Sequence, residues 1–324
     1  MKITFNTSQP QAASAEFYLN AFKGDPDISL MDQNYSNYDV ALFMTYDHEF
    51  IPSIKQSHPH LKIGILDPRN HKVAPSVESC DFIIIDSIEM EDYWRRSNIP
   101  IFRYAEYPSL PPIEKIHSED DFTRLGYHGN KIHLQCMSQN VTPALEELGE
   151  NYKLKLLVMY NGSSPQPSES WYPKNIDVEF CKWSYGSYET FLPLADIGLV
   201  PNNLIHDEGH KTRSQTSENF NYSPDDYSLR FKMPSNPGRI IVFGLMGIPV
   251  IADFFPSALQ YLQNGSGMVA HSKDGWKYCM EELIKDRLLR ESMGSNLKSL
   301  VKNRFDFKIQ NRDLKNFLFH ILKK

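Results

Sequence analysis

The sequence predicts an α/β protein of two domains, each a doubly wound parallel sheet with helices on both faces. Short aliphatic or β-branched runs recur along the chain with helical segments between them. The run 82–86 (FIIID) lacks polar alternation, as expected of a strand covered on both faces. The 324 residues are enough for two cores, at about 100–200 residues per domain.

The overall composition argues against two classes of protein. With 40 acidic and 34 basic residues the chain has a formal net charge of −6, whereas a protein that chiefly binds nucleic acid needs a basic surface. The longest nearly uncharged run, 240–255, is shorter than the roughly 20 residues that span a bilayer. The first ten residues lack the apolar stretch of a secretory signal. We therefore expect a cytoplasmic protein.

The first domain is predicted over residues 1–118. Its predicted strands are Lys2–Asn6, Ile28–Met31, Asp39–Met44, Lys62–Leu66, Phe82–Ile85 and Ile101–Tyr104, and its helices are Gln11–Phe22, Glu49–Gln56 and Ile88–Arg96. Three prolines lie in the stretch 107–118 (YPSLPPIEKIHS), which can continue neither a helix nor a central strand. The interdomain linker is therefore placed there.

The second domain is predicted over residues 119–306, where the alternation starts again. Its predicted strands are Arg124–Tyr127, Leu154–Tyr160, Val178–Cys181, Asp196–Val200, Pro249–Ala252 and Met268–Ala270. Its predicted helices are Thr142–Glu150, Tyr188–Leu194, Gly238–Met246, Ser257–Gln263, Trp276–Ile284 and Arg287–Arg304.

The last segment, 307–324, is predicted to be an amphipathic helix that packs back on the domains. Apolar residues recur in it at spacings of three to five. Residues 298–324 carry eight Lys or Arg against two Asp. This charge leaves two interpretations open: peripheral contact with an anionic membrane surface, or an ordinary solvated helix face.

The densest binding signal lies at residues 230–239 (RFKMPSNPGR). Ser235 or Asn236 can cap a helix whose first residue is Pro237. The unpaired amides at such a helix start attract an anion. Three cations accompany them: Arg230, Lys232 and Arg239. A diphosphate fits this arrangement without a metal, and the alternative is three ordinary surface cations near a capped helix.

The motif leads into 247–253 (GIPVIAD), in which a glycine ends the helix and a short apolar strand follows. Together with 195–201 (ADIGLVP), 254–256 (FFP) and 276–290, it resembles the second domain of nucleotide-sugar glycosyltransferases of the GT-B fold. The resemblance covers roughly residues 126–305. It implies two Rossmann-like, doubly wound parallel-sheet domains that face a cleft, with the sugar donor held by the second.

The sequence departs from the family's pattern at one place. Many retaining members have two glutamates eight residues apart, and the matching positions here hold Pro234 and Val242. The donor hydroxyls must therefore be contacted by other groups. Lys232 and Arg239 match the family's cationic positions, so the resemblance implies that they bind the donor diphosphate. It still favours a retaining hexosyltransferase.

Two further strand ends are candidate donor contacts. In 126–131 (GYHGNK), Gly129 would let the backbone approach a ligand closely, with Asn130 and Lys131 beside it. The alternative is a turn with a glycine at positive φ and a solvated lysine. In similar enzymes the loop after another strand borders the nucleotide base, so Trp183 or Tyr185 is expected to stack on it, unless Trp183 only packs in the core.

In the first domain, Asp47 and His48 directly follow a predicted strand and are the candidate catalytic residues. Either would be the general base of an inverting enzyme, and in a retaining enzyme both would orient the acceptor. The alternative for Asp47 is a helix N-cap. Residues 67–71 (DPRNH) end the next strand and are a second candidate lining. Neither the histidines near residue 208 nor the four scattered cysteines match a metal motif, so no metal is expected.

These observations predict a metal-independent glycosyltransferase that moves a sugar from a nucleotide-diphosphate sugar to a hydroxyl of a glycan or glycolipid. No separate cofactor and no nucleic-acid partner are expected. The resemblance alone suggests polysaccharide biosynthesis at the inner face of the membrane. Two alternatives stay open: a nucleotide-sugar epimerase of the same fold, and a non-catalytic two-domain ligand-binding protein.

Overall fold

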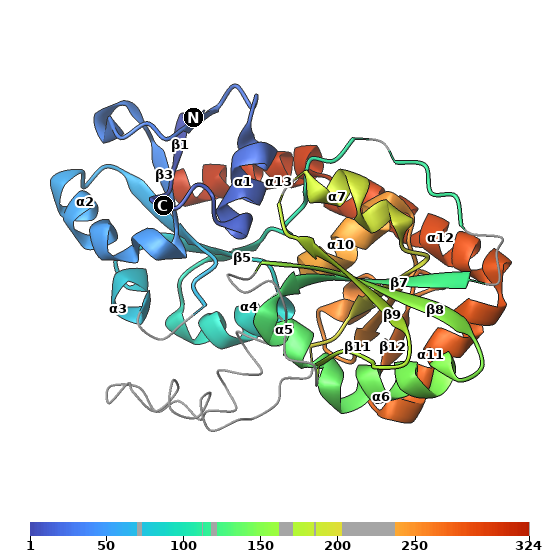
Figure 1. The fold of residues 1–324 in the computed structure, drawn as a ribbon. Coiled ribbons are helices and arrows are strands. Elements are labelled where there is room, and N and C mark those ends of the chain that lie inside the picture. The colour runs from blue at the N-terminus through green and yellow to red at the C-terminus, as the bar shows by residue number, and fades with distance from the viewer. Residues whose placement is uncertain are drawn as a thin grey trace. The chain divides into compact units, whose positions relative to one another are not determined.

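The computed structural model describes residues 1–69, 73–111, 113–117, 122–161, 171–184, 186–202 and 237–323, with the side chains of residues 131, 132 and 161 left out (Figure 1). The chain divides into two compact units. Unit 1 contains the described residues of 1–109 and 305–323, and unit 2 those of 110–202 and 237–304. Each unit has its own sheet and its own core.

The sheet of unit 1 has six parallel strands in the order β2-β1-β3-β4-β5-β6. The strands are β1 (Ile3–Asn6), β2 (Ile28–Leu30), β3 (Val40–Met44), β4 (Lys62–Leu66), β5 (Phe82–Ile85) and β6 (Ile101–Arg103). Because successive side chains of a strand point to opposite faces, Phe82 and Ile84 enter one core while Ile83 and Ile85 enter the other. This explains why the run has no polar alternation.

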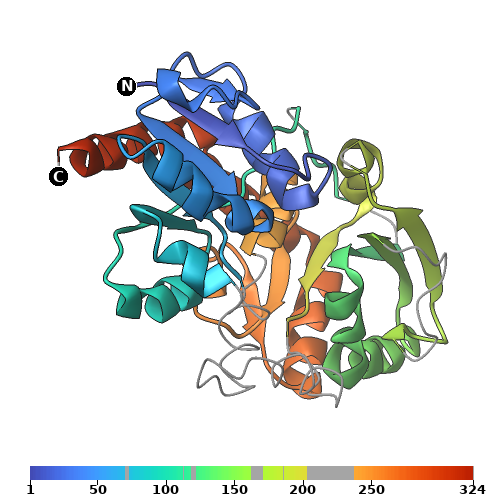
Figure 2. The ribbon, with the colours of Figure 1, turned by 90° about the vertical axis from the view of Figure 1, so that its left-hand side faces the viewer.

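Helices cover both faces of this sheet. They are α1 (Ala13–Phe22), α2 (Ile51–Ser57), α3 (Ala74–Val77), α4 (Ile88–Trp94) and α13 (Phe307–Leu322). Side chains of α1 and α13 share one core with β1 and β3, and those of α2, α3 and α4 form the other. Figure 2 shows α13, in red, against the unit that holds the N-terminus. Its apolar face is the one predicted from the spacing.

The sheet of unit 2 also has six parallel strands, in the order β12-β11-β10-β7-β8-β9. They are β7 (Phe122–Asn130), β8 (Lys153–Asn161), β9 (Asp177–Lys182), β10 (Ile197–Val200), β11 (Val250–Asp253) and β12 (Met268–Ala270). The two sheets therefore confirm the predicted fold class of two doubly wound, Rossmann-like parallel sheets.

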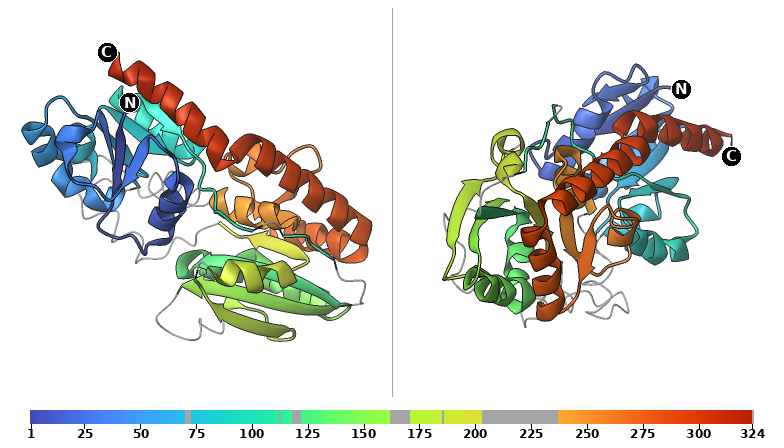
Figure 3. Two further views of the ribbon diagram at one scale, coloured as in Figure 1. Left: turned by 90° about the horizontal axis from the view of Figure 1, so that it is seen from above. Right: turned by 90° about the vertical axis from the view of Figure 1, so that its right-hand side faces the viewer.

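The described helices of unit 2 are α5 (Lys131–Gln135), α6 (Met137–Gly149), α7 (Ser187–Thr190), α10 (Pro237–Met246), α11 (Lys273–Lys285) and α12 (Arg287–Phe305). Side chains of α6 and α11 form one core with the sheet. Every residue of α10 is buried. It lies beside α12 (Figure 3), where Leu297 and Val301 pack against Gly244.

Several predicted boundaries shift in the structure. The predicted helix 257–263 is only a 3₁₀ turn, Ala258–Gln260, because Ser266 donates hydrogen bonds to the carbonyls of Tyr261 and Gln263 and ends it. The strand predicted at 124–127 continues to Asn130. The short helices α3 and α5 were not predicted. Among the described residues, no helix is long and apolar enough to cross a membrane.

Candidate functional site

Polar side chains follow the carboxyl ends of the strands in both units. In open parallel sheets this edge is where ligands bind. The predicted site residues divide into two groups, one on each unit. Five of them, Arg230, Lys232, Ser235, Asn236 and Tyr185, lie outside the described residues, as does the side chain of Lys131.

Gly129 lies near the end of β7 with φ +151°, a conformation that favours glycine. A Cβ there would be 2.9 Å from the Tyr127 hydroxyl oxygen and 3.2 Å from the Arg239 Cδ. The Tyr127 hydroxyl donates to the Asn130 carbonyl at 2.7 Å. The alternative interpretation of this segment predicted a turn with a glycine at positive φ. Gly129 does have a positive φ, but it lies within the end of β7 and not in a separate turn.

Asn130 is the N-cap of α5, since its side chain accepts the His133 backbone N–H at 3.2 Å. This uses its amide oxygen within the protein and leaves its amide nitrogen for another partner. Asn130 itself is exposed at the strand end, whereas His133 is fully buried. Gly129 and Asn130 thus stand at the ligand edge of the sheet.

Arg239 is buried completely in the first turn of α10. Its Nη2 donates to the Pro201 carbonyl at 3.2 Å and to the Asn202 side-chain oxygen. The guanidinium also lies 6.0 Å from the centre of the Tyr127 ring. Burial lowers the pKa of Arg239 from its ordinary value. The side chain predicted to bind a diphosphate therefore lies beneath the strand ends and joins α10 to the end of β10.

Asp253 completes this arrangement at the end of β11. Its Oδ2 accepts the Asn202 backbone N–H at 2.6 Å, and its Oδ1 accepts the Trp276 indole N–H at 3.0 Å. Asn202 in turn accepts from Arg239. One chain of buried hydrogen bonds therefore runs from α11 through β11 and the end of β10 to α10. The sequence analysis did not single out Asp253, although it closes the apolar run of residues 247–253.

His128 precedes Gly129 and is also buried. Its Nε2 donates to the Arg239 carbonyl at 3.3 Å, and its ring lies edge-on to Tyr188 and Phe243. Burial, together with the Arg239 charge, lowers the pKa of His128 to about 3. His128 is thus a neutral packing residue near neutral pH.

Trp183 follows β9 and is half-buried. Its indole N–H donates to the Tyr188 hydroxyl at 2.9 Å, and the two rings are nearly perpendicular with centres 6.1 Å apart. Tyr188 thereby fixes the position of the indole while part of it stays exposed. The described contacts agree with the packing interpretation and leave part of the indole accessible for a base.

The candidate catalytic residues of unit 1 lie in a 3₁₀ helix, Thr45–Phe50. Asp47 is not an N-cap: its Oδ1 accepts the Ser8 backbone N–H at 2.8 Å, which ties it to the segment after β1. Its Oδ2 is buried and accepts no hydrogen bond from the described residues. His48 is half-buried, and its Nδ1 lies 3.2 Å from the Ser76 hydroxyl.

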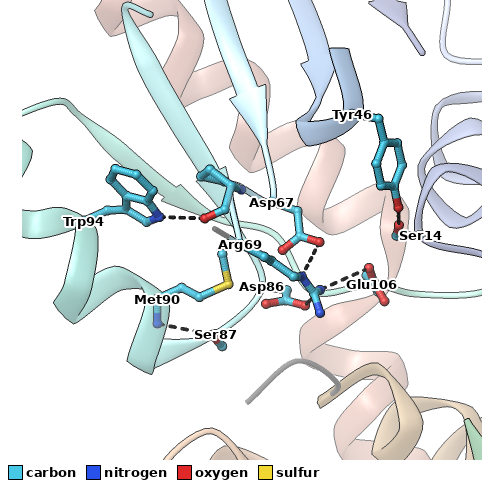
Figure 4. Close-up of polar contacts among 10 residues, drawn as sticks. Ser14, Tyr46, Asp67, Arg69, Asp86, Ser87, Met90, Trp94 and Glu106 are labelled. Atoms are coloured by element: carbon cyan, nitrogen blue, oxygen red, sulfur yellow. Dashed lines mark hydrogen bonds and ion pairs between the residues drawn. The ribbon is translucent and has the colours of Figure 1, made fainter. Parts of the chain in front are cut away.

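A cluster that the sequence analysis identified only in part lies at the ends of β4, β5 and β6 (Figure 4). Arg69 donates from Nε to Asp67 and, at 2.7 Å, from Nη2 to Asp86. The same Nη2 lies 3.7 Å from Glu106 Oε1. We call Asp67, Arg69, Asp86 and Glu106 the Arg69 cluster. Asp67 and Arg69 belong to the predicted lining segment 67–71, whereas Asp86 and Glu106 were not predicted.

Local structure holds this cluster in place. The Trp94 indole N–H donates to the Pro68 carbonyl at 2.9 Å and fixes the turn after β4. Ser87 caps α4 by accepting the Met90 backbone N–H at 3.3 Å, which fixes the segment after β5. Beside the cluster, the Tyr46 and Ser14 hydroxyls are 2.5 Å apart (Figure 4). Together they make the carboxyl edge of the unit 1 sheet strongly polar.

Among the described residues, no group of three or more His, Cys, Asp or Glu side chains is arranged to hold a metal ion. Two lysines of the basic segment 298–324 have partners among the described residues. Lys315 pairs with Asp25 and Asp27, and Lys298 donates to the Ile113 carbonyl. These two lysines are therefore half-buried and have partners among the described residues.

The sequence matches no family model and no curated protein. The structure, in contrast, is similar over nearly its whole length to solved glycosyltransferase structures. Anabaena HepE with UDP and glucose has a TM-score of 0.65 at 10% identity, covering 99% of this chain and 100% of HepE. A glycosyltransferase from Rickettsia africae has a TM-score of 0.64 at 11% identity, covering 99% and 98%.

Sucrose-phosphate synthase from Thermosynechococcus elongatus is also similar, with a TM-score of 0.59 at 12% identity over 89% of this chain and 74% of that one. At sequence identities of 10–12%, the similarity to these structures shows the fold alone. It agrees with the two six-stranded parallel sheets and with the motif resemblance. The chain has the GT-B fold of nucleotide-sugar glycosyltransferases.

Proposed function

We propose that the protein is a glycosyltransferase that moves a hexose from a nucleotide-diphosphate sugar to a hydroxyl of a glycan or glycolipid. Two observations together support this proposal. The chain superposes along 99% of its length on a structure solved with UDP and glucose, and polar groups follow the strand ends of both of its sheets. A fold alone does not define an activity, so the site residues below carry the rest.

The donor is assigned to unit 2. Gly129 permits close approach of a ligand to the end of β7, and Trp183 offers a partly exposed indole for a base. Arg239 supplies positive charge beneath these strand ends. Arg230 and Lys232, with the amides near Ser235 and Asn236, are the proposed direct partners of the diphosphate.

The chemistry of transfer explains these choices. As the glycosidic bond breaks, negative charge develops on the leaving diphosphate, and cations with helix amides stabilise it. We propose that they do so without a metal. Retention is the favoured outcome, and Asp47 and His48 then orient the acceptor; in an inverting enzyme one of them would remove its proton.

A screen of nucleotides tests the proposal. A ligand that binds only the folded chain raises its stability by about 2.7 kcal/mol at 100 times its Kd. We expect UDP, GDP, CMP or ADP to raise the Tm, and Lys232→Ala to weaken that nucleotide by about tenfold or more. Lys285→Ala, on the exposed end of α11, is the matched control. No Tm increase with any nucleotide would contradict the proposal.

Incubation with the nucleotide sugar that binds, without acceptor, separates the enzyme alternatives. Rapid epimerisation of the sugar would show that the protein is an epimerase of the same fold and not a transferase. Slow hydrolysis that accelerates with an acceptor supports transfer, and the anomeric configuration of the product decides between retention and inversion. Binding without turnover would favour a ligand-binding protein. We further propose a cytoplasmic setting in polysaccharide assembly, with peripheral membrane contact tested by vesicle sedimentation.

A further inference from the structure

The Arg69 cluster has more negative than positive groups. Among the described residues, three carboxyl groups surround a single guanidinium, so their full ionisation leaves two negative charges in excess. The three acids Asp67, Asp86 and Glu106 are 3%, 4% and 5% exposed, whereas the Arg69 side chain is 23% exposed. Buried charge that lacks a counter-charge is costly. Within the described part of the chain, the cluster therefore has less positive than negative charge.

Buried polar atoms that lack partners point to a ligand at this place. The Tyr18 residue is only 1% exposed, and its hydroxyl has no hydrogen-bond partner among the described residues. Burial and the charges of Glu106, Asp67 and Asp86 raise the pKa of Tyr18, so the hydroxyl lies within the field of the cluster. Oδ1 of Asp67 and Oδ1 of Asp86 also accept no hydrogen bond from the described residues.

These atoms define the chemistry of the missing group. It must donate hydrogen bonds and carry positive charge, because the open positions at the carboxylates are acceptors and the excess charge is negative. A phosphate is repelled by this charge. A metal is disfavoured, since the described acids do not form a group of three or more suited to one. An alkylammonium group has three donors and one charge, which meets both needs.

Resting on the proposed function, we propose that the Arg69 cluster binds the ammonium group of an amine-bearing acceptor, such as an amino sugar that is not acetylated. Glu106 is the carboxylate assigned to the ammonium. Its Oε1 lies 3.7 Å from Arg69, outside hydrogen-bonding distance, whereas Asp67 and Asp86 both accept from Arg69. Tyr18 and the two aspartates complete the site.

Proton exchange supports this assignment. Burial, opposed by Arg69 and aided by Asp67 and Glu89, raises the pKa of Asp86 to about 7. Burial, opposed by Arg69 and aided by Asp86 and Asp67, raises the pKa of Glu106 to about 8. Without a cation the cluster therefore retains protons near neutral pH. An ammonium ion that binds there replaces a proton, which is released to the solvent.

Calorimetry on the full chain tests the inference, with the nucleotide that raises the Tm in the screen present. The probes are the methyl glycosides of glucosamine, galactosamine and mannosamine, each beside its N-acetyl counterpart at about pH 7.5. We expect at least one amine to bind about tenfold tighter than its neutral counterpart. Its binding heat should differ between phosphate and HEPES buffers, because a proton is released. No preference for any amine over its acetylated form would overturn the proposal.

Three variants locate the effect. Glu106→Gln should remove the amine preference, whereas Glu106→Asp, which keeps the charge, should retain part of it. Glu78→Gln makes the same substitution on an exposed residue of unit 1 and should change nothing. An unchanged preference in Glu106→Gln would overturn the proposal. Titration of each sample with the nucleotide that raises the Tm keeps the two proposals apart. Nucleotide binding without amine preference contradicts only this one, whereas absence of binding by all of UDP, GDP, CMP and ADP to the unmodified chain contradicts the proposed function.

Discussion

The Asp253 carboxylate accepts the backbone N–H of Asn202 at 2.6 Å, and so ties the end of β11 to the residue that follows β10 by two positions. Both residues are buried. Because Asn202 also accepts from Arg239, this bond helps to fix the cation beneath the donor edge. Asp253 is therefore a positioning residue for the candidate donor site.

Replacing Asp253 by Asn should destabilise unit 2. The amide keeps only one acceptor oxygen, so either the Asn202 N–H or the Trp276 indole N–H loses its partner in a buried place. The expected loss in the free energy of unfolding is about 2 kcal/mol, measured by urea denaturation. Asp274→Asn, whose side chain is 89% exposed, should leave the stability nearly unchanged. Equal stability of both variants would show that these bonds contribute little.

Gly129→Ala should be costly because of both its φ and its surroundings. The backbone angle of +151° is unfavourable for alanine, and the new Cβ would lie 2.9 Å from the Tyr127 hydroxyl. We expect a loss of roughly 1–3 kcal/mol and weaker nucleotide binding. Gly186→Ala is the matched control, since no atom lies within 4 Å of its added Cβ. A Tm decrease of similar size in both variants would contradict the argument.

Substitutions of Trp183 test whether its indole stacks on the nucleotide base. If the indole stacks on the nucleotide base, Trp183→Ala should weaken nucleotide binding by about 1–3 kcal/mol. Trp183→Phe keeps an aromatic face but loses the hydrogen bond to Tyr188, so it should retain most of the affinity. Kd values from calorimetry check this order. Equal affinity of the alanine and phenylalanine variants would assign Trp183 to packing alone.

The buried acids of the Arg69 cluster predict a fall in stability between about pH 6.5 and 8. The folded chain holds protons on Asp86 and Glu106 up to about pH 7 and 8, whereas unfolded carboxyls release theirs near pH 4. This stabilisation is fully present below about pH 4 and is lost as the pH rises from there through about 7 and 8. His117 and His128, with pKa lowered to about 4 and 3, act in the opposite direction only below about pH 6.5.

Glu106→Gln should flatten this dependence. The charged groups that face Glu106 are Arg69, Asp86 and Asp67. The three acids also raise the pKa of Tyr18. Asp67 and Glu106 raise the pKa of Tyr46 as well. The neutral amide cannot titrate, so a decrease of roughly 2 kcal/mol in the unmodified chain should shrink by about half in the variant. Urea unfolding at about pH 6.5, 7.25 and 8 measures it. An equal decrease in the free energy of unfolding in both proteins would show that the titrating group is not Glu106.

Much of the architecture is predictable from the sequence because it depends on local patterns. The bounds of β4, β5 and β12 match their predicted ranges to the residue, since each apolar run ends at polar residues. Pro237 begins α10 and Gly247 follows it at φ +76°, as the capping pattern predicts. The GT-B resemblance of residues 126–305 is confirmed by the structural neighbours.

The sites were less predictable because they depend on long-range pairing. Asp67, Asp86 and Glu106 are about 20 residues apart in sequence and meet only because β4, β5 and β6 are neighbours in the sheet. Arg239 has the sequence context of an exposed cation at a helix start. Its burial results from the ends of β7 and β10, which lie against it and which no local pattern of α10 reveals.

The last helix affects the order in which the chain can fold during synthesis. Leu314, Leu318 and Ile321 of α13 complete a core that β1 and α1 begin some 300 residues earlier, and Asn311 accepts from the Tyr104 hydroxyl of the same unit. The described residues of unit 2, in contrast, all lie between 110 and 304 and so precede α13 in the chain. During synthesis on a ribosome, unit 2 is therefore able to fold first. The core of unit 1 that α13 covers stays exposed until α13 has been synthesised.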